Sequence, residues 1–122
     1  MPKRILVVED DADARRLIES ILKLSGLNVV LAADGQEGLE KAQTESPDLV
    51  ITDIAMPRLN GLGLIHELRG LPNFKNIPIL AVTSYGMDKA MEAIRAGANR
   101  ALARPVQNHL LLVFVFDLLN QA

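Results

Sequence analysis

Acidic residues stand directly behind two short apolar runs, where they could hold a metal ion. Glu9 and Asp10 follow the run 5–8, and Asp53 lies just beyond the run 49–51. Carboxylates held together repel one another, and a hard divalent cation such as Mg2+ relieves that repulsion and prefers oxygen ligands. If the two runs are neighbouring strands, the sequence therefore predicts a magnesium site.

Two hydroxyl residues and an arginine directly follow two further apolar runs, and their side chains could donate hydrogen bonds to the oxygens of a phosphoryl group. Thr83 and Ser84 follow the run 79–82, and Arg104 follows a weaker run at 101–103. Hydroxyl and guanidinium groups donate hydrogen bonds, which phosphoryl oxygens accept. Each residue alone is equally well explained as a helix cap or a surface charge. The occurrence of such groups behind four runs together favours a functional site.

The apolar runs alternate with segments of helical spacing. The runs show no period-two alternation, which indicates strands buried on both faces, as in a parallel sheet; they lie at 5–8, 29–31, 49–51, 79–82 and 101–103. Helical spacing occupies 12–25, the segment between Gly35 and Pro47, the segment from Gly61 to Gly70, 87–96 and 106–121. This order predicts an α/β fold, a doubly wound parallel sheet of five strands with five helices on its two faces. Ligands of such sheets bind outside the carboxyl ends of the strands, where the candidate residues stand.

Two of the helical segments carry recognisable apolar spacing. In the segment 12–25, Leu17, Ile21 and Leu24 recur at i, i+4 and i+7, with polar residues elsewhere. In the segment 87–96, one face collects apolar residues: Met87, Ala90, Met91 and Ile94. Both patterns predict helices.

Composition excludes several classes of protein. The 122 residues fit one domain, which we expect to span 1–122. There is no cysteine, so disulfide frameworks, thiolate metal sites and cysteine nucleophiles are excluded. A net charge of −2 offers no basic field for nucleic acid or a membrane surface, and no apolar run approaches the roughly 20 residues of a membrane span. We expect a cytoplasmic protein.

The chain resembles the receiver domain of two-component response regulators over residues 3–119. The resemblance rests on the acidic start and the strand that ends in Asp53, together with short motifs around the later strands. Its carriers are Ile5–Asp11, Pro47–Asp53, Met56-Pro57 with Gly61, Ile77–Ile79, Val82–Ser84, Ala96–Ala98 and Arg104-Pro105.

The resemblance implies a flavodoxin-like strand order 2-1-3-4-5 and a phosphorylation switch. Asp53 would accept a phosphoryl group from a sensor histidine kinase or a histidine phosphotransfer protein. Asp10, Asp53 and the backbone carbonyl of Ala55 would hold Mg2+, with Glu9 acting mostly through water. Thr83 would donate a hydrogen bond to a phosphoryl oxygen. The protein would catalyse only its own phosphorylation and dephosphorylation.

Two departures from the family pattern leave a second hypothesis open. The family nearly always has lysine where this chain has Arg104, and usually an aromatic residue where it has Ala101. Arginine is not a conservative replacement for lysine, because its charged group is planar and forked. A pseudo-receiver, acting as a constitutive dimerisation or docking module, is therefore the alternative. A magnesium-dependent phosphohydrolase with Asp53 as nucleophile is disfavoured, since Ala55 stands where a second aspartate would be needed.

The remaining expectations concern the lifetime of the phosphorylated state and the partner surfaces. Ala55 and Tyr85 occupy positions that govern the hydrolytic water in receivers, and neither orients water, which predicts slow dephosphorylation. Ala14 and Ile18, at the start of the first helix, are candidates for contact with the histidine-bearing partner.

In the segment 106–121, residues outside the inward stripe are also apolar, which predicts a homodimer through the last helix. The inward stripe consists of Leu111, Val115, Leu118 and Leu119. The apolar residues that point outward are Leu110, Leu112, Val113, Phe114 and Phe116. Of these, we expect Leu112, Val113, Phe114 and Phe116 to form the dimer interface.

Overall fold

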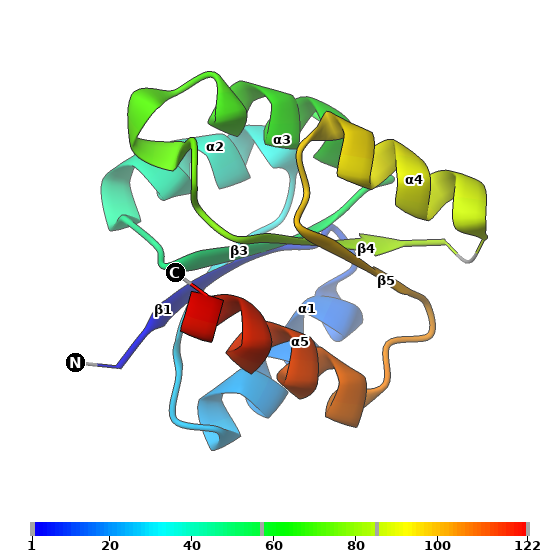
Figure 1. Cartoon of the computed structure of the whole chain (residues 1–122). Helices are drawn as coiled ribbons and strands as arrows, with labels where there is room; N and C mark the ends of the chain where they lie inside the picture. The colour runs from blue at the N-terminus through cyan, green and yellow to red at the C-terminus, as the bar shows by residue number, and fades with distance from the viewer. Residues whose placement is uncertain (1, 57, 85, 122) are drawn as a thin grey trace.

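Five parallel strands form one sheet in the order β2-β1-β3-β4-β5, in a computed structural model that describes residues 2–56, 58–84 and 86–121. The strands are β1 (Arg4–Val8), β2 (Asn28–Ala32), β3 (Leu49–Asp53), β4 (Ile79–Thr83) and β5 (Arg100–Ala103). The helices are α1 (Ala12–Leu24), α2 (Gly35–Glu45), α3 (Gly61–Arg69), the 3-10 turn η1 (Pro72–Phe74), α4 (Met87–Ala96) and α5 (Asn108–Gln121). In Figure 1, α1 and α5 cover one face of the sheet, and α2, α3 and α4 cover the other. The predicted fold and strand order are confirmed.

Parallel pairing brings the carboxyl ends of four strands to one edge of the sheet. Asp53 at the end of β3 pairs with Val82, and Thr83 at the end of β4 pairs with Ala103 of β5. β1 lies on the other side of β3, in register with it. Residues directly behind β1 and β5 therefore lie on the same edge as Asp53 and Thr83, as the sequence predicted.

The core consists of two hydrophobic clusters, one on each face of the sheet. Successive side chains of a strand point to opposite faces, so each central strand feeds both clusters. In β1, Ile5 and Val7 enter the cluster under α1 and α5, whereas Leu6 and Val8 enter the cluster under α2 and α3. Complete burial of side chains this large stabilises the fold by roughly 1.5–3 kcal/mol each, and it holds the strand ends rigidly in place.

The buried face of α1 differs from the one that the spacing indicated. Ile18, Ile21 and Leu22 are buried, while Leu17 is 54% exposed and Leu24 is 89% exposed. Both stripes fit a period of 3.6 residues, and the direction in which the helix leaves β1 decides between them. The apolar face predicted for α4 is also largely open to solvent, because this helix buries only Ala93 against the sheet.

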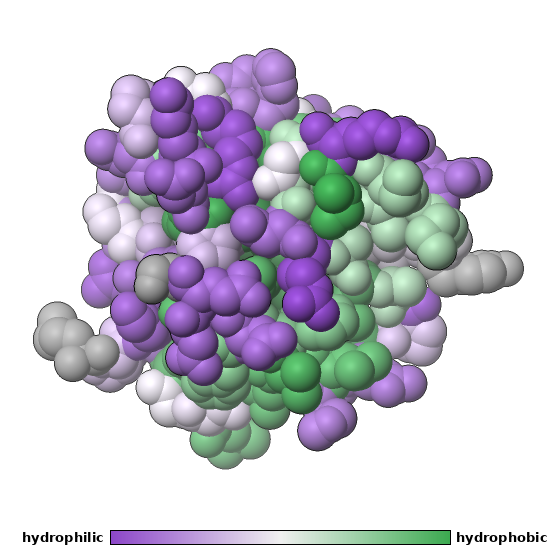
Figure 2. Space-filling model, viewed as in Figure 1, coloured by the Kyte–Doolittle hydropathy of each residue, from purple (hydrophilic) through white to green (hydrophobic). Residues whose placement is uncertain are grey.

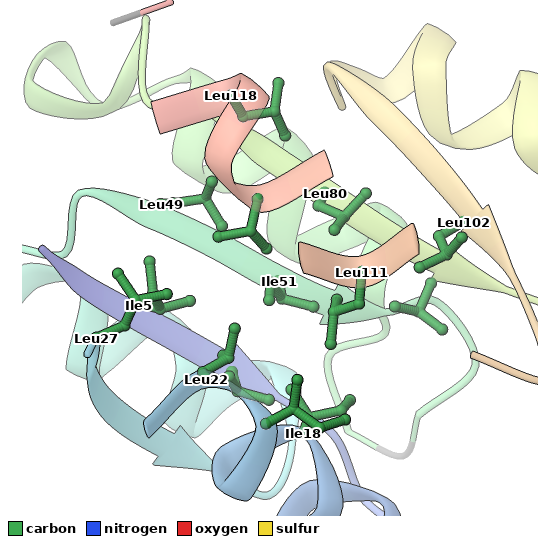
Figure 3. Packing of buried hydrophobic residues seen from close by; sticks show 14 of the residues in the cluster. Ile5, Ile18, Leu22, Leu27, Leu49, Ile51, Leu80, Leu102, Leu111 and Leu118 are labelled. Carbon is green, nitrogen blue, oxygen red and sulfur yellow. The ribbon is translucent and has the colours of Figure 1, made fainter. Parts of the chain in front are cut away.

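The C-terminal helix α5 buries the predicted stripe of Leu111, Val115, Leu118 and Leu119. Figure 3 shows Leu111 and Leu118 lying against Leu80 and Ile51 of the sheet. Among the residues expected to point outward, Leu112 and Phe114 are half-buried and pack against this cluster, whereas Leu110, Val113 and Phe116 are exposed. None of the helices in the described ranges has both the length and the apolarity for a membrane crossing.

Candidate functional site

Three carboxylates converge at the carboxyl edge of the sheet. Oxygen atoms of Glu9, Asp10 and Asp53 all lie within 4.8 Å of one another. Glu9 and Asp53 are buried, with 2% and 7% of their surfaces exposed, whereas Asp10 is exposed. The parallel register of β1 and β3 produces this convergence, because Glu9 and Asp53 follow neighbouring positions of the two strands.

The loop after β3 is held close to Asp53 by a glycine. The backbone N–H of Gly61 donates to the carbonyl of Ile54 over 2.8 Å. A Cβ atom at Gly61 would lie 2.1 Å from the carbonyl oxygen of Asp53, closer than any side chain can approach. Ala55, two residues beyond Asp53, is exposed in this loop. The tight approach fixes where the chain turns after the candidate phosphoacceptor.

Arg104 reaches across β4 to the acidic residues. Its Nη2 atom lies 3.0 Å from Asp53 Oδ2 and also contacts Glu9 Oε1. The backbone N–H of Arg104 donates to the carbonyl of Thr83 over 2.9 Å. This bond fixes the backbone position from which the Arg104 side chain extends. Burial lowers the pKa of Arg104, but the hydrogen bond to Glu9 and the charge of Asp53 outweigh it, so the pKa is raised overall.

Glu9 is held by its backbone neighbours as well as by Arg104. Its Oε2 accepts the backbone N–H of Asp11 over 3.1 Å, and its carbonyl accepts a hydrogen bond from Arg15 Nη1 over 2.8 Å. Burial raises the pKa of the Glu9 carboxyl, and the hydrogen bonds from Arg104 and Asp11 oppose this rise only in part. Sequence reasoning missed Arg15, because a charged residue on a helix gives no signal that distinguishes it from ordinary surface charge.

The side chain of Asp11 lies outside the carboxylate cluster and has a structural role. Its side chain accepts the backbone N–H of Ala14 over 2.8 Å and caps the start of α1. An N-cap of this kind satisfies a backbone donor that the helix leaves free. Of the three consecutive acidic residues, only Glu9 and Asp10 therefore face the site.

Thr83 provides a buried hydroxyl that has no hydrogen-bond partner among the described residues. Its side chain is 1% exposed and lies at the end of β4, between Asp53 and β5. Buried polar groups are nearly always paired, so this hydroxyl is available to a ligand or a water molecule that binds at the carboxyl edge of the sheet. Ser84 is exposed beside it, Ala101 in β5 is half-buried, and Tyr85 lies outside the described residues.

The donor set fits a hard divalent cation. Three carboxylates offer only oxygen ligands, and the described part of the chain brings no histidine to this cluster. Mg2+ is bound in proteins by one or two carboxylates with water and carbonyl oxygens completing its shell. Glu9, Asp10 and Asp53 match that requirement in kind.

A small cleft opens beside the site between α1 and the segment after β5. It has a volume of about 220 Å³ and is mainly apolar, lined by Ala14, Leu17, Ile18, Ile21, Arg104, Pro105 and Val106. Ala14 and Ile18, the two residues expected to face a partner, both line this cleft, but Ile18 is only 4% exposed and packs in the core. Leu17 takes the exposed position instead, because α1 is rotated relative to the predicted stripe.

A doubly wound α/β domain that gathers carboxylates, a buried hydroxyl and a cation at this edge has the groups that suit a metal ion and a phosphoryl group, as in signalling domains of the α/β class. The family model for the response regulator receiver domain matches residues 5–115. The chain therefore belongs to the receiver domain family of two-component response regulators. As a receiver domain it is a phosphorylation-controlled signalling module rather than an enzyme of the usual kind, and the pseudo-receiver alternative finds no support.

Individual relatives agree with this assignment. The response regulator MprA of Mycolicibacterium vanbaalenii is 36% identical over 99% of this chain, which spans 52% of that regulator's length. The chemotaxis protein CheY4 of Vibrio cholerae is similar in structure, with a TM-score of 0.91 and 30% identity over 97% of this chain and 99% of its own. The receiver domain of the sensor histidine kinase PA1611 from Pseudomonas aeruginosa has a TM-score of 0.91 and 29% identity, covering 98% and 99% of the two chains. That structure contains a magnesium ion coordinated in the active-site cleft.

Proposed function

We propose that Asp53 accepts a phosphoryl group from a phosphohistidine of a sensor kinase or phosphotransfer protein, in a magnesium-dependent reaction. A carboxylate oxygen of Asp53 attacks the phosphorus, the bond from phosphorus to the imidazole nitrogen breaks, and the histidine leaves with the electron pair. The observation that carries the proposal is the buried Thr83 hydroxyl, which has no partner among residues 2–56, 58–84 and 86–121, on the strand next to that of the buried Asp53. A hydroxyl in that position donates to a phosphoryl oxygen once the group is attached.

The surrounding residues would bind the metal ion and stabilise the negative charge of the phosphoryl group. Asp10 and Asp53, with Glu9 and the carbonyl of Ala55, would hold Mg2+, which neutralises charge on the phosphoryl oxygens. Arg104 supplies a second positive charge within hydrogen-bonding distance of Asp53. Phosphoryl transfer needs mainly positioning and electrostatic stabilisation, and these groups provide both without covalent participation.

Intact mass spectrometry tests the phosphoacceptor. Incubation with Mg2+ and acetyl phosphate should produce one phosphoryl adduct, which peptide mapping locates on Asp53. Asp53→Asn should abolish the adduct. Asp11→Asn is the matched control, because asparagine caps a helix as well as aspartate does. An adduct that persists in Asp53→Asn would refute the assignment.

We further propose that the apolar cleft beside the site receives the histidine-bearing partner. Leu17 lines this cleft and is 54% exposed, next to Pro105 and Val106. Leu17→Asp should slow transfer from a cognate phosphohistidine protein and leave labelling by acetyl phosphate unchanged. Leu24→Asp is the control, since Leu24 lies on the same helix, is 89% exposed and does not line the cleft. Equal effects of the two variants would contradict the proposed docking surface.

The exposed apolar residues of α5 support a homodimer through this helix. Val113 and Phe116 are 41% and 40% exposed, and Leu112 and Phe114 flank them in half-buried positions. Figure 2 shows hydrophobic residues gathered over α5 and α4 on one side of the molecule. Sedimentation of the unphosphorylated protein should reveal a dimer that Val113→Glu with Phe116→Glu disrupts. A monomer over the whole concentration range would overturn this proposal.

A further inference from the structure

The start of α2 lies directly against the β3–α3 segment, which the structure describes at residues 54–56 and 58–60. A Cβ atom at Gly35 would lie 1.8 Å from the carbonyl oxygen of Leu59, so the two backbones approach as closely as a glycine permits. Leu59 is half-buried and packs against the hydrophobic cluster on this face of the sheet, where α2 and α3 lie side by side (Figure 1). Leu59 therefore lies at the junction of α2 with the start of α3.

An ion pair joins α2 and the β3–α3 segment through their side chains. Arg58 Nη1 lies 3.3 Å from Asp34 Oδ2. The other carboxylate oxygen of Asp34 accepts the backbone N–H of Glu37 over 2.9 Å and caps the start of α2. Asp34 thus binds the helix with one oxygen and Arg58 with the other. Only 14% of the Asp34 side chain is exposed, so salt screens this pair less than it screens a pair of exposed side chains.

Arg58 holds its position against a backbone cost. Its φ is 65°, in the left-handed region that glycine adopts more readily than any residue with a side chain. A residue other than glycine persists there when contacts around it stabilise the conformation, and such residues cluster at functional sites. The ion pair with Asp34 is a contact of this kind.

The β3–α3 segment is also the backbone that follows the candidate phosphoacceptor. It begins directly after Asp53, and the backbone N–H of Gly61 closes its far end by donating to the carbonyl of Ile54 over 2.8 Å. Few residues separate these two anchors. A displacement at Arg58 is therefore transmitted to Ala55, which lies in the same short segment.

We propose that Arg58 is a positioning residue, which holds the β3–α3 segment against α2 through Asp34 and so sets the carbonyl of Ala55 for the metal ion. The inference rests on the metal site in the proposed function. A direct effect of charge would have opposite signs at the two residues: loss of the arginine would tighten cation binding, and loss of the aspartate would weaken it. Positioning predicts that either loss weakens it.

Electron paramagnetic resonance of free Mn2+, an ion that prefers the same oxygen ligands as Mg2+, measures this effect without any phosphodonor. Arg58→Met removes the charge and keeps the length of the side chain, and Asp34→Asn removes the charge and keeps a residue that caps helices well. Each should raise the dissociation constant for Mn2+ by about threefold, the size expected for a partly exposed ion pair. The double variant should also show about threefold, because both changes remove the same contact.

Two further variants separate positioning from other effects. Arg58→Lys should restore most of the affinity, since it keeps a positive charge that can pair with Asp34. Arg95→Met is the matched control and should leave the constant unchanged, because Arg95 is exposed in the last turn of α4 and its loss changes the net charge equally.

Three outcomes of the titration would overturn the positioning role and leave the proposed function standing. They are unchanged constants, tighter binding by Arg58→Met, and an additive effect of about ninefold in the double variant. The absence of Mn2+ binding in the wild type would instead remove the metal site, and with it the proposed function.

Hydrogen exchange in the metal-free protein gives an independent readout. The N–H of Gly61 should exchange about threefold faster in Arg58→Met, because the segment that it closes has lost its contact with α2. The N–H of Glu37, which Asp34 accepts, should keep its rate. An unchanged rate at Gly61 would refute the tie between the two segments, and equal acceleration at Glu37 would show that α2 itself has loosened, which also overturns the positioning role.

Discussion

Arg69 joins the end of α3 to the elements around it, and replacing it with methionine should destabilise the whole domain. Its guanidinium donates to the carbonyls of Gly97, Phe74 and Ile77 over 2.8 Å each, and to the side chain of Asn99 over 2.9 Å. Burial lowers the pKa of Arg69, and the side chain finds backbone carbonyls rather than a carboxylate as its closest acceptors. The arginine thus ties the end of α3 to η1 and to the segment 97–99 between α4 and β5.

The expected loss follows from the acceptors that Arg69→Met leaves without a partner. An orphaned buried acceptor costs about 1–3 kcal/mol, and the lower end applies where water can enter. Three carbonyls at about 1 kcal/mol each predict a loss of about 3 kcal/mol in the free energy of unfolding. With a urea dependence of about 1.5 kcal/mol per molar, the midpoint of unfolding should fall by about 2 M.

Urea denaturation followed by circular dichroism measures this loss. Arg69→Lys should recover only a small part of it, because an ammonium cannot reach acceptors in several directions at once. Arg95→Met again serves as the control, since Arg95 is exposed on the neighbouring helix α4. If Arg69→Met shifts the midpoint no more than Arg95→Met does, the carbonyl contacts do not stabilise the fold as argued.

Three further predictions concern the site. Gly61→Ala should destabilise the protein by about 2 kcal/mol or more, measured by thermal unfolding, because its Cβ would lie 2.1 Å from the carbonyl oxygen of Asp53. The folded pKa of Glu9 is raised above 4.5, so the folded state binds its proton more tightly, and stability should fall as pH rises from 4.5 through the folded pKa. Glu9→Gln should flatten that slope in unfolding curves measured across pH, and an unaltered slope would rule out Glu9 as its source. Asp10→Asn should weaken Mg2+ binding sharply and Asp11→Asn only slightly, and comparable effects in a magnesium titration would count against the ligand assignment.

The buried faces of α1 and α5 show what the spacing of apolar residues can predict about a helix and what it cannot. For α5, the predicted stripe is the buried one, since Leu111 and Val115 are fully buried and Leu118 is 2% exposed. For α1, only Ile21 of an equally regular stripe is buried, while Leu17 and Leu24 are exposed and Ile18 and Leu22 lie in the core. Periodicity establishes that a segment is helical, but the rotation of the helix about its axis depends on packing against the sheet.

The location of the site could be predicted from sequence because parallel strands end at one edge. Apolar runs followed by Glu9, Asp53 and Thr83 were sufficient to place these residues together, and strand pairing does so in the structure. The N-cap position of Asp11 likewise follows from residue type and from the start of a helical segment. These features depend on local sequence and on the order of the strands, both of which the chain itself carries.

The contacts within the site depended on tertiary structure. That Arg104 spans β4 to reach Glu9, that Thr83 lacks a partner among the described residues, and that Asp10 remains exposed beside buried carboxylates are consequences of packing. Each requires the distance between strands and the direction of a side chain, which residue spacing does not contain. The sequence by itself determined which chemical groups meet at the edge of the sheet, and the tertiary structure decided which of them touch, because contact depends on the three-dimensional burial of each group.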